Sequence, residues 1–70
     1  MNERTLRLMK LIEHWAEHND EHGQRFNESA AEAEDLGLTG VSKEMKEAYL
    51  KALEVSRHLR NALTRLKESV

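Results

Sequence analysis

The chain has 70 residues, which allow one domain with a small core; chains of this size often need a metal, a disulfide or a second copy to be stable. It has no cysteine, which excludes disulfides, thiolate metal sites and cysteine nucleophiles. The net charge of −2 argues against general nucleic-acid binding, and no apolar run reaches the roughly 20 residues of a membrane span. We therefore expect one cytoplasmic domain over residues 1–70, with no nucleic-acid or membrane partner.

The first predicted helix covers about residues 3–36. The chain has no proline and is rich in Ala, Leu, Glu, Lys and Arg, which favour helices. Asn2 is a suitable N-cap. Apolar residues recur at spacings of three and four, which indicates one buried face with Trp15 at its centre and Phe26 inside. This stripe contains Leu8, Leu11, Ile12, Trp15, His22, Phe26, Ala30 and Ala33.

The middle of this helix contains poor helix formers. Asn19 and Asp20 are followed by Gly23, so a turn over residues 19–23 and a three-helix chain are an alternative. The stripe nevertheless keeps its phase across this region, whereas an inserted turn would normally reset it. We therefore predict one long helix, in which Gly23 marks either a kink or a close approach of another helix.

The strongest break in the sequence lies over residues 37–42. Gly37 suits the left-handed position that commonly follows a helix, and Leu38 can then fold back onto Ala33 in a Schellman motif. Ser42 is a suitable N-cap for the next helix. A connection of this length predicts that the two helices are antiparallel neighbours.

The second predicted helix covers about residues 43–68. Its apolar residues include a seven-residue repeat, which favours bundle packing. Two helices alone would leave much of each apolar face in water, so we predict an all-α antiparallel hairpin that forms a homodimer, a four-helix bundle. The repeat consists of Met45, Ala52, Leu59 and Leu66.

Three of the four histidines follow one another at four-residue intervals. His14, His18 and His22 would lie one above the other along the first helix, with His22 nearest the buried face. Two histidines at this spacing can bind one metal ion, and neighbouring carboxylates can add a ligand or orient an imidazole. Glu17 and Glu21 directly precede two of the histidines.

The fourth histidine extends this candidate metal site. A hairpin that turns between residues 36 and 42 would place His58 level with residue 20, between His18 and His22. His18, His22 and His58, with Glu21 or Glu17, would then form a cluster that suits Zn, Ni or another divalent transition metal. Its role would be metal handling, metal sensing or stabilisation of the dimer.

Two other interpretations do not require a metal. The chain can be a non-catalytic interaction module that pairs with itself or with a protein partner, its histidines being structural groups that determine register. Alternatively, the histidines can make dimerisation sensitive to pH. Ser42 and Ser56 have no His-Asp arrangement around them, and no glycine-rich phosphate loop is present. We therefore expect no catalytic activity.

The segment from His14 to His22 reads His-Trp-Ala-Glu-His-Asn-Asp-Glu-His. Together with Phe26 and residues 36–38, it resembles a small helical domain of uncharacterised function from archaea and anaerobic bacteria, with the pattern His-Trp-x-Glu-His-Asn-x-Glu-His. The resemblance implies that these residues act as a unit, and it implies no particular activity.

Overall fold

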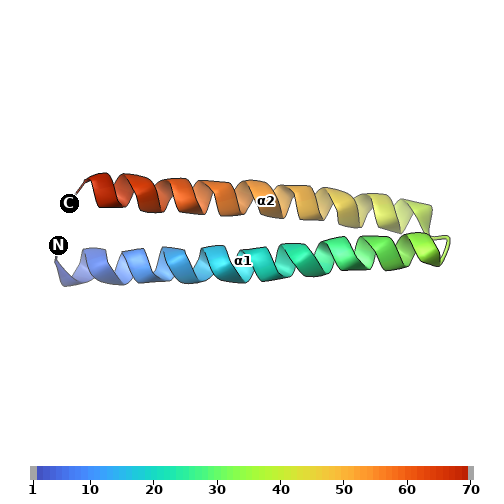
Figure 1. Cartoon of the computed structure of the whole chain (residues 1–70), viewed down its shortest axis with the longest axis horizontal. Helices are drawn as coiled ribbons and strands as arrows, with labels where there is room; N and C mark the ends of the chain where they lie inside the picture. The colour runs from blue at the N-terminus through green and yellow to red at the C-terminus, as the bar shows by residue number, and fades with distance from the viewer. Residues whose placement is uncertain (1, 70) are drawn as a thin grey trace.

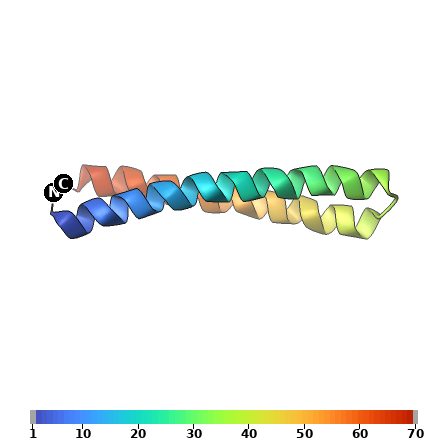
Figure 2. The same cartoon turned by 90° about the horizontal axis from the view of Figure 1, so that it is seen from below.

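The structure is a computed structural model that describes residues 2–69, and it is an antiparallel hairpin of two long helices. Helix α1 spans Glu3–Asp35 and helix α2 spans Thr39–Glu68. The helices lie side by side along a hairpin 53 Å long, with both chain ends at one end of the molecule (Figure 1). A view turned by 90° shows the two helices crossing near their middle (Figure 2). The predicted all-α helical hairpin is confirmed.

Helix α1 is continuous, as the unbroken phase of its apolar residues predicted. At its start, the Asn2 side chain accepts a hydrogen bond of 2.8 Å from the Thr5 backbone N–H, which confirms the predicted N-cap. The helix passes through residues 19–23 without a turn. Within residues 2–69, neither helix combines the length and the hydropathy needed to cross a membrane.

The connection between the helices is the predicted Schellman motif. Gly37 has a φ of 76°, which favours glycine because this residue has no Cβ. The Leu38 N–H donates to the Ala33 carbonyl oxygen at 2.8 Å, and the Gly37 N–H donates to the Glu34 carbonyl oxygen at 2.9 Å. These bonds satisfy carbonyl groups that the end of α1 leaves free.

The second helix begins at Thr39, four residues earlier than predicted. Ser42 is therefore not an N-cap, and the connection is shorter than residues 37–42. The Ser42 backbone N–H donates within the helix to the Leu38 carbonyl oxygen, while its hydroxyl donates to the Ala30 carbonyl oxygen at 2.9 Å. The serine thus links α2 to α1, because its side chain faces the other helix.

The two helices meet along residues with the alternating three- and four-residue spacing of a coiled coil. Among residues 2–69, the fully buried positions are all small, so the helices pack closely and enclose no large side chain. Half-buried larger residues continue the same series toward the ends of the hairpin. The buried residues are Ala16, Gly23, Ala30 and Ala33 of α1 and Ala52 and Ser56 of α2.

The prediction that Trp15 is the centre of the buried face of α1 is wrong. Trp15 is 49% exposed, and His22 is also exposed. The next residues along the helix, Ala16 and Gly23, face α2 instead. A Cβ added at Gly23 would lie 3.1 Å from the Ala52 Cβ, so Gly23 marks a close approach of the two helices. An indole at the interface would force the helices apart.

Candidate functional site

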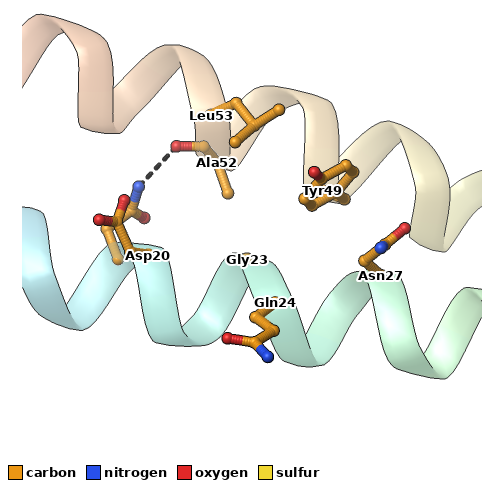
Figure 3. Close-up of a pocket in the computed structure, with 8 residues that line it drawn as sticks. Asp20, Gly23, Gln24, Asn27, Tyr49, Ala52 and Leu53 are labelled. Atoms are coloured by element: carbon orange, nitrogen blue, oxygen red, sulfur yellow. Dashed lines mark hydrogen bonds between the residues drawn. The ribbon is translucent and has the colours of Figure 1, made fainter.

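A chain of hydrogen bonds crosses the middle of the helix interface. The Asn19 amide nitrogen donates to the Ala52 carbonyl oxygen at 2.6 Å, the bond drawn as a dashed line in Figure 3, and to the Ser56 hydroxyl oxygen at 2.8 Å. The Ser56 hydroxyl in turn donates to an Asp20 carboxylate oxygen at 2.5 Å. A different alignment of the helices would leave these groups unpaired, so the chain of bonds favours a single register.

The same carboxylate is held from the other side by Arg60. Its two terminal nitrogens donate to the two oxygens of Asp20 at 2.6 Å and 3.2 Å. The guanidinium of Arg60 first, and the hydroxyl of Ser56 second, lower the pKa of Asp20 below its ordinary value of 3.8. The carboxylate raises the pKa of Arg60 in return. Asp20 therefore stays ionised and paired at neutral pH.

These contacts belong to one side of the hairpin, which we call the polar flank. Each of its residues follows a residue of the helix interface by four positions. In an antiparallel coiled coil, side chains at this position on the two helices lie next to each other at the edge of the interface. A second contact joins the helices there, because the Lys46 ammonium donates to the Asn27 side-chain oxygen at 3.0 Å. The polar flank is defined by Asp20 and Asn27 of α1 and Lys46 and Arg60 of α2.

On the polar flank Leu53 is also exposed, but the opposite side of the hairpin carries a longer series of apolar residues. Each residue of this series directly precedes a residue of the helix interface. On α1 the series has alternating spacings of three and four residues, as in a coiled coil. The two histidines at the end of this series replace the apolar residues that the spacing predicts. This apolar flank comprises Leu8, Leu11, Trp15, His18 and His22 of α1 and Val41, Ala48, Val55 and Ala62 of α2.

The histidine column is present on the surface of α1. The ring centroids of His14 and His18 are 4.2 Å apart, and those of His18 and His22 are 6.4 Å apart. The Phe26 ring follows at 6.3 Å from His22. All three histidines are exposed, so the predicted entry of His22 into the core is wrong. Imidazole nitrogens one turn apart are accessible here to an ion or to another chain.

The other predicted ligands do not complete a metal site within one chain. Over residues 2–69, no group of three or more His, Asp or Glu side chains is placed to hold a metal ion. Because Asn19 contacts Ala52 and Ser56, His58 lies closer to the level of Trp15 than to that of residue 20. A transition-metal site therefore stays a prediction.

The two predicted acidic ligands, Glu17 and Glu21, are both exposed. The charge of Glu17 helps to raise the pKa of Arg60, so this carboxylate lies within electrostatic range of the polar flank. A metal bound by His18 and His22 would need its remaining ligands from another source.

The sequence pattern does not predict the hydrogen-bond network that joins Asn19, Asp20, Ser56 and Arg60. The available signal was Asn19, a polar residue at a position where the spacing predicts an apolar one. Pairing it with Ser56 required the register of the two helices, which the helix periodicity does not contain.

Comparison with known proteins identifies the family. A family model described as a domain of unknown function, DUF8180, matches residues 8–66, which include most of both helices. The chain belongs to the DUF8180 family. An uncharacterised protein of Archaeoglobus fulgidus is similar to this DUF8180 chain, with 39% identity over 57 residues that cover 81% of the chain and 90% of that protein. No solved structure matches the chain. The expected resemblance to a small domain of unknown function is confirmed, and the histidine pattern stays a prediction.

Proposed function

We propose that this DUF8180 chain is a non-catalytic helical interaction module that acts as a homodimer, with the apolar flank of one copy packed against that of the other in a four-helix bundle. The observation that supports this most is the large amount of apolar surface left exposed. Leu8, Leu11, Trp15, Val41 and Val55 are all exposed, although each has the size of a core residue. Contiguous apolar surface of this kind is typical of protein interfaces.

The surface areas support a second copy as the occupant. The chain exposes 5477 Å², whereas a compact monomer of 8.1 kDa exposes about 4,500 Å². A compact particle of twice the mass exposes about 7,500 Å², so dimerisation would bury about 3,500 Å² in total. Obligate homodimers bury about 2,000–5,000 Å². A second copy that brought the pair to the dimensions of a compact protein would therefore bury an area typical of obligate homodimers.

The test uses two leucines with nearly equal exposure. Leu11, on the apolar flank, is 46% exposed, and Leu50, on the outer surface of α2 near the polar flank, is 45% exposed. Sedimentation equilibrium should show a dimer for the wild type and for Leu50→Glu, and a monomer for Leu11→Glu, because only the latter buries a charge in the interface. Circular dichroism should show that both variants remain helical.

The single tryptophan supplies an independent readout. Trp15 is half exposed in one chain and would be covered by the second copy, so its emission should shift to shorter wavelength as the protein concentration rises. A wild-type chain that stays monomeric at high concentration would contradict the homodimer, and the flank would then suit an apolar helix of another protein. Equal dissociation of both leucine variants would show that the chosen flank is wrong.

A second candidate function is the binding of a divalent transition metal by the histidine column. The supporting observation is the alignment of three exposed imidazoles along one helix, with ring centroids 4.2 Å and 6.4 Å apart. Zn or Ni would suit nitrogen ligands of this kind. Elemental analysis of untagged protein purified without a chelator would test it, and absence of bound metal together with no binding of added Zn²⁺ would reject it.

A further inference from the structure

Charge is distributed unequally along the hairpin. The half nearest the chain ends, residues 2–19 and 55–69, contains seven basic and four acidic side chains. The half that contains the connection, residues 20–54, contains four basic and nine acidic side chains. One end of the 53 Å hairpin is therefore net positive and the other net negative. Two copies attract each other most strongly when opposite ends lie together.

Apolar side chains occur at both ends of the apolar flank, and histidines occupy its middle. Leu8 and Leu11 lie in the first third of α1, while Val41 lies at the start of α2, next to the connection, and all three are exposed. His18 lies close to the middle of α1, which spans Glu3–Asp35. An antiparallel pair would thus place leucines of one copy against the connection of the other, and histidines of both copies near the symmetry axis.

We propose that two copies pack antiparallel through the apolar flank and that His18 and His22 of both copies together bind one divalent transition metal at the centre of the interface. This inference rests on the proposed homodimer. It accounts for two observations at once: two imidazoles occupy positions where the spacing predicts apolar residues, and one chain, over the part described, offers no group of three metal ligands.

The chemistry of the site follows from the residue types. Each chain supplies two neutral imidazoles one helical turn apart, so the dimer supplies four nitrogen ligands. Four ligands of this kind suit Zn²⁺, which prefers tetrahedral coordination in closed sites and needs no further protein ligand there. His14 lies on the outer side of the column, away from the seam formed by Trp15, His18 and His22, and has no role in this site.

The metal part of the proposal is tested by titrating untagged protein with Zn²⁺ and measuring stoichiometry and the dimer dissociation constant together. We expect one Zn²⁺ per two chains and a dimer tightened by about tenfold or more, the scale of a typical coupling between two binding events. His18→Gln and His22→Gln should abolish both effects, whereas the matched control His14→Gln should keep them. All three histidines are exposed, so each variant should keep the helical fold.

The results separate the site from the dimer. One Zn²⁺ per chain, lost in His14→Gln, would overturn the shared site and indicate a chelate of His14 and His18 within one chain. A dimer that binds no Zn²⁺ would overturn the metal site and leave the proposed homodimer intact. A chain that stays monomeric with and without Zn²⁺ would overturn both proposals.

The orientation is tested with a spin label at the connection, which is simple because the chain has no native cysteine. In Thr39→Cys, the two labels of an antiparallel dimer should lie at opposite ends, at a separation close to the 53 Å length of the hairpin. In a parallel dimer they would lie roughly 20 Å apart, about two helix spacings. Pulsed electron-electron double resonance measures the distance between the two labels. A distance near the shorter of these two values would overturn the antiparallel arrangement.

Discussion

The two flanks of the hairpin border the same helix interface, yet they differ in what the chain does with them. On the polar flank, Asp20 and Arg60 pair across the helices, and Lys46 reaches Asn27, so the chain satisfies these groups itself. On the apolar flank, Trp15 and its neighbours remain half exposed. The polar flank thus links the two helices of one chain, whereas the apolar flank is the surface that we propose for a second copy.

The largest change in stability should come from Gly23, a position between the two flanks where the helices approach closely. Gly23→Leu should destabilise the fold by about 3 kcal/mol, because its side chain would have to displace Ala52, whose Cβ already lies 3.1 Å from an added Cβ. Separation of the helices would also weaken the contacts of the polar flank. Urea unfolding at one fixed protein concentration measures the effect.

Gly40 offers a control at a position with open space around it. It lies within α2, and a Cβ added there would meet no atom within 4 Å. Gly40→Ala should leave stability unchanged or raise it by about 0.5–1 kcal/mol, since alanine loses less backbone entropy in a helix. Equal stability of Gly23→Leu and the wild type would contradict the close packing of the helices.

A medium effect is expected from the buried serine of the polar network. Ser56→Ala removes the donor to Asp20 and the acceptor of one Asn19 bond, and should cost about 1–2 kcal/mol. The loss should leave dimerisation through the apolar flank unchanged, which sharpens the distinction between the flanks. Unfolding curves and sedimentation of the same variant measure both properties, and a monomeric Ser56→Ala chain would contradict the separation.

The smallest effect concerns pH. The pKa of Asp20 is lower in the folded chain than its ordinary value of 3.8, so the stability it contributes is fully present above that value and is lost as the pH falls through the folded pKa. The side chains of Asp20 and Arg60 are about half exposed, so the contribution should be below about 1 kcal/mol.

Comparison with Asp20→Asn isolates this contribution from the other carboxylates. The stability difference between wild type and variant should be constant above about pH 5 and should shrink below pH 3.8, where Arg60 remains charged but Asp20 becomes neutral. Urea unfolding between pH 2 and pH 7 measures it. A difference that grows as the pH falls would contradict the assigned direction of the shift.

The apolar flank shows why only part of the candidate site was predictable. The periodicity of α1 contains two overlapping series with coiled-coil spacing, one through Trp15 and one through Ala16. Because large apolar side chains are usually buried, the sequence predicts the series through Trp15 as the buried one. The choice in the folded chain depends on the distance between the helix axes, and Gly23 and Ala52 allow an approach that excludes an indole. The same choice places His22 on the surface.

The sequence by itself determined the features that depend on neighbouring residues: two long helices, the cap at Asn2, the Schellman motif at Gly37 and the column of histidines along α1. Each results from backbone preferences or from the 3.6-residue period, which act within a few residues. Only the tertiary structure decided which face of α1 meets α2 and which distant groups pair, as Asp20 does with Arg60. Those features depend on the register and separation of two helices, which no local pattern specifies.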